Sequence, residues 1–173
     1  FGFVEVGTVT PLNQYGNPKP RIFRLEEDEA LINRLGFNSS GSEKVRSRII
    51  SNSPKGLFGI NIGPNKDTNK KEEDYLIGLR KFYNLADYLT INISSPNTEN
   101  LRSFHNEDEL SKLLDLVEKE KKILKTKIPI VVKISPDIKD ENINIIAELL
   151  LKHNVEAVII SNSTDRNREN LSN

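Results

Sequence analysis

The sequence predicts an α/β protein built from parallel strands that alternate with helices. From Leu57 onward, short apolar segments rich in β-forming residues are each followed by an amphipathic helical segment. The apolar segments are almost continuous in apolar character, which is typical of strands that helices cover. The 173 residues suffice for one domain with a hydrophobic core. Because no low-complexity stretch or linker divides them, we treat residues 1–173 as a single domain.

Five parallel strands are expected in this domain. They are placed near residues 3–9, 57–62, 88–94, 129–135 and 156–161. Apolar residues at helical spacing predict helices between the later strands, around residues 75–86, 110–117 and 143–150. Asn106 is a favourable N-cap for the second of these helices, and Glu109 three residues later would complete a capping box.

The first third of the chain departs from this alternation. Pro and Gly turn signals in residues 10–20 precede a short β-like segment, which predicts a hairpin excursion after the first strand. Residues 27–50 are then expected to form a short helix, a turn at residues 36–38 and a second helix.

Polar residues at the strand ends help to choose between a doubly wound sheet and a partial (β/α)8 barrel. Asn61, Asn92, Lys133 and Asn162 each stand near the carboxyl end of a strand, among apolar neighbours. One such residue would ordinarily be a core or turn group, but four at equivalent positions favour a barrel with a ligand site at that face. Amides both donate and accept, which suits a planar heterocycle with imide edges, and Lys133 adds a positive charge.

The composition argues against several other classes of function. The formal net charge is zero, so no basic face indicates a nucleic-acid partner. The absence of cysteine removes thiolate metal ligands and a cysteine nucleophile from this segment. There is no G-x-G-x-x-G turn after the first strand, no P-loop and no H-E-x-x-H, and we predict no metal site. The two histidines, His105 and His153, are isolated and are expected at the surface or at helix ends.

Six segments carry a resemblance to a known family. In chain order they are VEVGTVTP, KPRIFRL, INRLGFN, GINIGPNKDT, NISSPNTENLR and VKISPD. Together they resemble class 2 dihydroorotate dehydrogenase, a membrane-associated, quinone-reducing flavoenzyme. The resemblance implies a (β/α)8 TIM barrel that binds FMN at the carboxyl ends of its strands. It also implies oxidation of dihydroorotate to orotate in pyrimidine (UMP) biosynthesis, with a quinone as the final electron acceptor.

The same resemblance makes Ser95 the catalytic base. In this family the second serine of the S-S-P-N motif takes a proton from C5 of dihydroorotate, while the hydride at C6 passes to N5 of FMN. Class 1 relatives have cysteine at that place, so the serine itself favours class 2. A serine hydroxyl is a weak base and can serve only in a closed, well-positioned site. The loop at residues 98–105 that follows it is predicted to be a polar lid.

The resemblance also implies contacts with the cofactor and the substrate. FMN would be bound by Thr8, Asn61, Asn92, Lys133 and Ser161. The substrate would be bound by Asn33, Arg34, Leu35, Gly36, Phe37, Asn92, Asn97, Asn162 and Ser163. Lys133 would stabilise negative charge on the flavin ring, and Gly36 would let the backbone approach the ligand closely.

Several parts of the family are not matched here: the first barrel strand, the later strands with the FMN phosphate loops, and the helices that form the quinone tunnel. We therefore expect a barrel domain that is incomplete at both ends and inactive by itself. A segment outside these residues would attach it peripherally to the cytoplasmic membrane of a bacterium, or to the mitochondrial inner membrane of a eukaryote. Two alternatives stay open: a related FMN barrel that acts on another pyrimidine, and an inactive barrel fragment with a structural or binding role.

Overall fold

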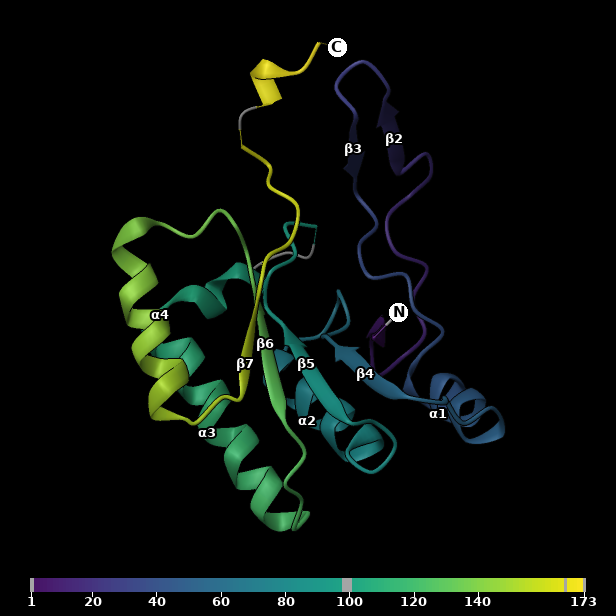
Figure 1. Ribbon diagram of the computed structural model, residues 1–173, viewed down its shortest axis with the longest axis vertical. Coiled ribbons are helices and arrows are strands. Elements are labelled where there is room, and N and C mark those ends of the chain that lie inside the picture. Colours follow the sequence, from purple (N-terminus) through teal and green to yellow (C-terminus); the bar gives the residue numbers. More distant parts are fainter. Residues whose placement is uncertain (1, 98–100, 167, 173) are drawn as a thin grey trace.

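The computed structural model describes residues 2–97, 101–166 and 168–172. From β4 onward, strands and helices alternate along the chain (Figure 1). The elements are β1 Phe3–Val9, β2 Ile22–Leu25, β3 Ala30–Asn33, α1 Ser42–Ser51, β4 Leu57–Ile62, α2 Lys71–Phe82, β5 Tyr88–Asn92, η1 Leu101–His105, α3 Glu107–Ile123, β6 Ile130–Ile134, α4 Asp140–Lys152, β7 Ala157–Ile160 and η2 Arg168–Asn170. All five parallel strands expected from the sequence are present, and the last three end one or two residues earlier than predicted.

Five strands form one parallel sheet, in the order β1, β4, β5, β6, β7. The order never reverses, which fits a barrel wall and differs from a doubly wound sheet, where the strand order turns back at its centre. The register pairs Asn61 with Thr90 and Asn92 with Lys133. Polar residues of neighbouring strands therefore lie at similar heights, towards the carboxyl-terminal edge of the sheet.

Helices α1 to α4 follow one another along a single face of the sheet, and each contacts the next (Figure 1). The core lies between this helical layer and the sheet, where Leu79, Phe82 and Leu89 are fully buried. Gly78 of α2 faces Ile62 of β4, and a Cβ at Gly78 would lie 3.0 Å from the Ile62 side chain. The glycine therefore allows the helix to pack closely on the strand.

No helix of the described residues covers the opposite face of the sheet. Phe3, Leu57, Tyr88, Val131 and Ile159 are among the residues that line a hollow of about 480 Å³ on it. At the β7 edge, Ile160 is 76% exposed. None of the helices in the described part of the chain has the length and apolar character needed to cross a membrane.

The hairpin predicted after β1 is present, but its second strand replaces a predicted helix. β2 and β3 pair antiparallel, with Phe23 opposite Ile32 and Leu25 opposite Ala30. The expected short helix after residue 26 is therefore wrong. The acidic run at residues 26–29 forms a turn, and Glu29 has a positive φ of 48° that a helix would not allow. Cross-strand pairing of apolar residues outweighs the helix-forming residues here.

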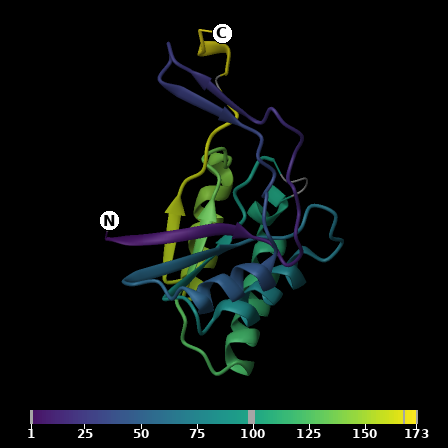
Figure 2. The ribbon, with the colours of Figure 1, turned by 90° about the vertical axis from the view of Figure 1, so that its right-hand side faces the viewer.

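The hairpin rises from the sheet and lies beside the carboxyl-terminal segment (Figure 2). The two are joined at the hairpin turn, where the backbone N–H and hydroxyl of Ser172 donate to the Asp28 carboxylate. The predicted second helix of this region is α1. Asn106 is the N-cap residue of α3 as predicted, but its side chain makes no capping hydrogen bond. Three acidic residues in the first turn of α3 favour its amino terminus instead.

Candidate active site

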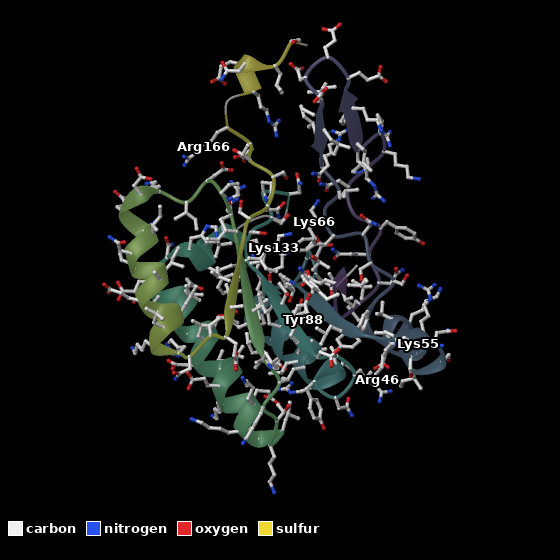
Figure 3. The ribbon with its side chains drawn as sticks, in the orientation of Figure 1. Arg46, Lys55, Lys66, Tyr88, Lys133 and Arg166 are labelled. Atoms are coloured by element: carbon white, nitrogen blue, oxygen red, sulfur yellow. The ribbon has the colours of Figure 1, made fainter. Side chains whose placement is uncertain are left out.

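A cavity of about 300 Å³ opens at the carboxyl ends of the strands. Its lining comes from β1, the end of β3 and the segment after it, β5 and the loop after it, β6, and the loop after β7: Gly7, Thr8, Asn33, Leu35, Gly36, Phe37, Asn38, Asn92, Ser95, Pro96, Asn97, Lys133 and Asn162. Lys133 lies towards the upper end of the sheet in Figure 3. The structure thus brings together Ser95, Lys133 and most of the asparagine side chains that were predicted to bind ligands. Gly7 and Asn38 also line this cavity, and sequence reasoning missed them.

Four predicted site residues do not line the cavity. Asn61 lies one hydrogen bond behind it and accepts from the Thr8 hydroxyl at 2.8 Å. The Arg34 guanidinium donates to the Pro20 carbonyl at 2.8 and 3.0 Å, away from the cavity. Ser161 and Ser163 flank Asn162, and the Ser163 backbone N–H donates to the Asn162 side-chain oxygen at 2.7 Å. Asn61, Ser161 and Ser163 therefore support the residues that line the cavity, whereas Arg34 points away from it.

The two adjacent serines after β5 have different environments. Ser94 is fully buried, and its hydroxyl donates to Asn92 Oδ1 at 2.7 Å and accepts from Asn162 Nδ2 at 2.8 Å. Ser95 is 5% exposed and faces the cavity, and its Oγ accepts from the Asn97 backbone N–H at 3.2 Å. Within the described ranges the Ser95 hydroxyl donates to no protein group. Ser95, unlike Ser94, is therefore free to bond a ligand.

Asn97 and Gly36 join this loop to the segment that follows the hairpin. The Asn97 side-chain amide is 3.4 Å from both the backbone and the side-chain oxygen of Asn33. Gly36 has a positive φ of 70°, and a Cβ there would lie 2.9 Å from the Asn17 side chain. Glycine is therefore required at position 36 because the backbone there lies close to Asn17. Gly36 also lines the cavity.

A charged cluster fastens the loops after β5, β6 and β7 to one another. Arg102 donates to Asp137 at 3.1 Å and to Asp165 at 3.3 Å, and its Nε lies 3.5 Å from the Ser94 carbonyl. Thr164 and the Asp165 backbone also donate to Asp137, whose side chain is 5% exposed. Burial alone would raise the pKa of Asp137, but these hydrogen bonds and the Arg102 charge lower it to about 2. Asp137 is therefore ionised at neutral pH.

The two histidines are buried at helix ends, which is one of the two placements that the sequence predicted. His105 and His153 are only 7% and 8% exposed. Burial, followed by the positive charge of Arg102, lowers the pKa of His105 to about 4. His153 Nδ1 lies 2.9 Å from Glu118. The packing of η1 and α4 against α3 accounts for both positions, which isolated histidines in a sequence do not indicate.

The predicted polar lid at residues 98–105 is wrong in the part that can be compared. Its first three residues lie outside the described residues. The remainder is η1, in which Leu101 and Phe104 are buried and Phe104 packs edge-on against Tyr75 at 5.8 Å between ring centroids. This segment is therefore part of the core and holds the loop of Ser95 from behind.

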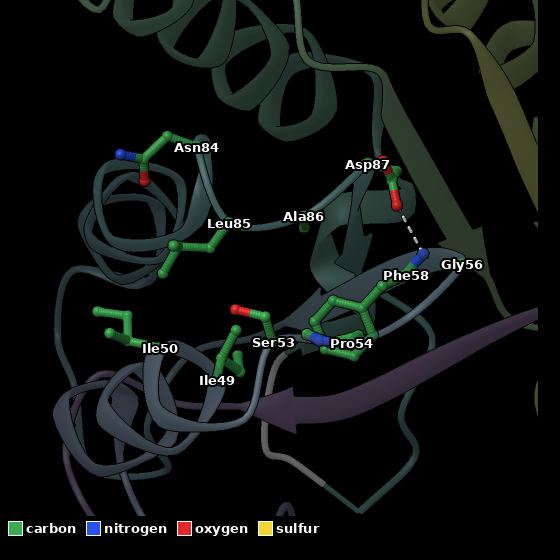
Figure 4. A pocket seen from close by; sticks show the side chains of 10 residues that line it. All are labelled: Ile49, Ile50, Ser53, Pro54, Gly56, Phe58, Asn84, Leu85, Ala86 and Asp87. Atoms are coloured by element: carbon green, nitrogen blue, oxygen red, sulfur yellow. Dashed lines mark hydrogen bonds between the residues drawn. The ribbon is translucent and has the colours of Figure 1, made fainter.

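A different hollow, distinct from the one on the open face of the sheet and also of about 480 Å³, lies at the opposite end of β4 (Figure 4). Its lining includes Ile49, Ser53, Leu85 and Asp87, and the Asp87 carboxylate accepts from the Phe58 backbone N–H at 2.7 Å. The amino-terminal face of a barrel usually contributes stability, whereas the carboxyl-terminal face binds ligands. The cavity at the carboxyl ends of the strands is the smaller of these two, but more polar side chains line it.

The chain is similar to known proteins over nearly its whole length. The family model described as dihydroorotate dehydrogenase matches residues 1–172. Dihydroorotate dehydrogenase (quinone) of Bordetella avium is 50% identical over 173 residues, and that of Bartonella tribocorum is 48% identical over 168 residues. Each match covers 95% of this chain and 50% and 47% of the respective relative. The chain therefore spans about half the length of the curated relatives it matches.

Solved structures give the same result for the fold. The ligand-free DHODH of Eimeria tenella matches with a TM-score of 0.93 and 38% identity, covering 100% of this chain and 55% of that one. The same enzyme in complex with ferulenol matches with a TM-score of 0.92 and 39% identity, covering 99% of this chain and 53% of that one. The sheet order agrees with these matches, and the chain belongs to the dihydroorotate dehydrogenase family.

Proposed function

We propose that the polypeptide containing this chain oxidises dihydroorotate to orotate in pyrimidine biosynthesis, with FMN as the hydride acceptor and a quinone as the final electron acceptor. The observation that carries the proposal is the position of Ser95. Its hydroxyl faces a cavity ringed by the amides of Asn92, Asn97 and Asn162, and by Lys133. The curated relatives named above are quinone-dependent enzymes of this kind.

Ser95 would act as the base that removes the proton from C5 of dihydroorotate. Its Oγ already accepts one hydrogen bond, from the Asn97 N–H, which leaves one lone pair and the hydroxyl proton for a ligand. The low exposure of Ser95 keeps water from competing for the same atom. A weak base becomes effective in such a site because the reacting atoms are positioned before the proton moves.

The donor set of the cavity fits a flavin. A flavin ring presents carbonyl oxygens and a ring nitrogen along one edge, and Lys133 and the Asn92 amide supply donors for acceptors of that kind. Bound FMN would supply the chemistry of accepting the hydride from C6. Lys133 would stabilise the accompanying negative charge through its ammonium group, and Thr8 and Asn61 would hold Asn92 in place from behind.

The quinone and the membrane would be met by parts of the polypeptide outside these residues. We propose a peripheral location on the cytoplasmic membrane in a bacterium, or on the mitochondrial inner membrane in a eukaryote. The domain of residues 1–173 would then be the part of an FMN-binding barrel that carries the base and the amide ring, and these residues alone would be inactive.

Anaerobic mixing of the full polypeptide with dihydroorotate, followed by flavin absorbance, tests this function. Bleaching of the flavin that a soluble quinone reverses, and that fumarate or NAD does not, is the expected result. Loss of the bleaching in Ser95→Ala would support the role of the base. A protein that binds flavin but is not bleached would show that the cavity accepts another pyrimidine, and the substrate contacts proposed here would then be withdrawn.

A further inference from the structure

The wall of the cavity contains a residue whose backbone conformation is unusual for its side chain. Gly36 and Phe37 both line the cavity, and both have a positive φ, of 70° and 53°. We call these two residues the 36–37 turn. A positive φ is ordinary for glycine but uncommon for a bulky side chain. Such a conformation persists where the surrounding structure holds it, so contacts around the 36–37 turn must hold Phe37 in place.

Hydrogen bonds between backbone groups account for the other non-glycine residues with positive φ in the described part of the chain, but not for Phe37. Each of the others donates its own N–H to the carbonyl three residues earlier and so closes a turn. They are Glu29 (3.3 Å), Lys125 (3.2 Å) and Asn154 (3.1 Å). Within the described ranges, residues 36–38 make no hydrogen bond from backbone to backbone, and the nearest such bonds are those of Leu35 and Ser39. A side chain therefore has to hold the 36–37 turn.

The side-chain amide of Gln14 supplies these bonds. Its Nε2 donates to the Gly36 carbonyl at 3.2 Å and to the Phe37 carbonyl at 2.9 Å. Its Oε1 accepts from Asn65 Nδ2 at 2.9 Å and from the Lys66 backbone N–H at 3.0 Å. Both N–H groups and both lone pairs of the amide are therefore in use. Because carbonyls only accept and a backbone N–H only donates, these partners also fix which way the amide points.

The ring of Phe37 contacts the same region of the protein. It is partly buried against the hydrophobic core, and a Cβ at Gly63 would lie 3.0 Å from it. Gly63 directly follows β4, and Asn65 and Lys66 belong to the same loop. The ring contact places the side chain, whereas the bonds from Gln14 hold the carbonyls. The 36–37 turn is thus fixed against the loop after β4 at two points.

We propose that Gln14 is a positioning residue for the site, because its side-chain amide holds the 36–37 turn in the conformation in which the turn lines the cavity. Gln14 is not among the residues that line the cavity, so it acts on a ligand through the turn. Release of the turn should change this part of the wall and weaken binding of the ligand. The identity of that ligand, dihydroorotate or orotate, rests on the proposed function.

Two variants separate this role from a general role in joining loops. Gln14→Glu has the same shape and keeps the acceptor for Asn65 and Lys66, but it puts an oxygen in place of the donor to the two carbonyls. The control is Asn65→Ala, which removes the bonds of Asn65 to Leu12 and to Gln14 Oε1 and leaves the Gln14 donors in place. Both variants lose hydrogen bonds of one junction, but only Gln14→Glu releases the turn.

Orotate binding to the full polypeptide with flavin bound, followed through the flavin absorbance, tests the consequence. Gln14→Glu should weaken binding about tenfold or more, and Asn65→Ala less than twofold. Gln14→Met, which is neutral and of the same length, should resemble Gln14→Glu and replaces it if the carboxylate prevents folding. Unchanged binding in the Gln14 variants, or equal weakening in Asn65→Ala, would assign Gln14 to loop joining alone and overturn the proposal.

The position of the Phe37 ring can be followed without any ligand. In the full polypeptide labelled with 4-fluorophenylalanine, the 19F NMR signal of Phe37 is identified by its loss in Phe37→Leu. We expect this signal to shift or to split in both Gln14 variants and to stay unchanged in Asn65→Ala. An unchanged signal in the Gln14 variants, or the same change in Asn65→Ala, would overturn the proposal. If the unaltered protein binds no orotate, the proposed function fails. The 19F comparison then still decides whether Gln14 holds the turn, so the two failures are distinguishable.

Discussion

The two ends of the parallel sheet use polar side chains in different ways. At the amino-terminal end, Asp87 and Glu156 each stand just before a strand and hold the neighbouring strand by a pair of bonds. The Asp87 N–H donates to the Phe58 carbonyl at 2.8 Å, and the Phe58 N–H donates to the Asp87 carboxylate at 2.7 Å. Glu156 and Ile130 repeat this arrangement at 3.1 and 2.7 Å. At the carboxyl-terminal end, side chains bond to side chains, in a series that links Asn162, Ser94, Asn92 and Thr8.

This difference separates stability from site geometry. A carboxylate that caps a backbone N–H acts locally, and each of the two caps can be lost without affecting the other. Side chains that are linked in series are coupled, so the loss of one removes a hydrogen-bond partner from the next. The hollow at the amino-terminal end is the larger one, about 480 Å³ against 300 Å³. Connected polar groups, rather than volume, mark the end at which we expect chemistry.

The largest expected effect is that of Ser95→Ala. If Ser95 is the base, the rate of flavin reduction by dihydroorotate should fall by about 10²–10⁴-fold, with little change in the free energy of unfolding. The matched control is Ser53→Ala, which removes a hydroxyl at the hollow of the amino-terminal end and should leave the rate within about twofold. Stopped-flow absorbance measures both variants. Nearly intact reduction in Ser95→Ala would show that the serine is structural.

The next effect is expected at Arg102, which ties the loop of Ser95 to Asp137 and Asp165. Arg102→Met keeps the length of the stem but removes the charge, and should let the Ser94 and Ser95 segment shift. Since small displacements of reacting groups are costly in rate, we expect kcat to fall by about 10–100-fold. Arg102→Lys should recover part of the loss.

The control for Arg102 is Lys121→Met, because Lys121 makes a single ion pair to Glu156 at the amino-terminal end, at 3.2 Å. It should leave kcat unchanged. If both variants lower kcat equally, ion pairs at the two ends of the sheet affect turnover alike, and site geometry is not confined to the carboxyl-terminal end.

A smaller effect, on stability alone, is expected for Asp87→Ala. Removing the carboxylate leaves the buried Phe58 N–H without its acceptor, which should lower the free energy of unfolding by about 1–3 kcal/mol. The kcat of the remaining folded protein should not change, since Asp87 lies at the end opposite the cavity. Urea unfolding and turnover, compared for Asp87→Ala and the milder Asp87→Asn, measure the two effects. A loss of turnover in protein that is still folded would contradict the separation of the ends.

The sequence predicted the parallel sheet well, because strand residues such as Ile60, Leu89 and Val132 are buried by helices and their apolar character is local information. It failed at residues 27–33, where the acidic turn and the pairing of Phe23 with Ile32 depend on a partner strand. Helix propensity gives no warning of such a partner.

The candidate site was predicted less completely. The strand-end amides were visible because a polar residue in an apolar run is conspicuous. Glu5, which accepts a hydrogen bond from Asn61, was missed, although it stands between two valines in β1 and had the same signal. The burial of His105 could not be foreseen, because it results from η1 packing behind the loop of Ser95. Contacts of that kind join residues through space, and their spacing along the chain does not reveal them.

The smallest expected effect is a pH dependence that His105 gives to the carboxyl-terminal end. Its folded pKa, about 4, lies below the ordinary value of 6.5 because burial and the Arg102 charge disfavour protonation. Between these values the unfolded chain binds more protons, so the stability that His105 contributes is complete above about pH 6.5 and is lost as the pH falls towards 4. Between about pH 7.5 and 5.5 the loss should be about 1 kcal/mol.

Replacing His105 by Gln should remove this part of the pH dependence. The difference in free energy of unfolding between the two pH values should shrink by about 1 kcal/mol relative to the unaltered protein. Ser53→Ala at the amino-terminal end removes no titrating group, and should keep the full difference. Urea unfolding at both pH values measures the three proteins. An undiminished difference in His105→Gln would mean that the acid sensitivity arises elsewhere, and the two ends of the sheet would then not be distinguished by their response to pH.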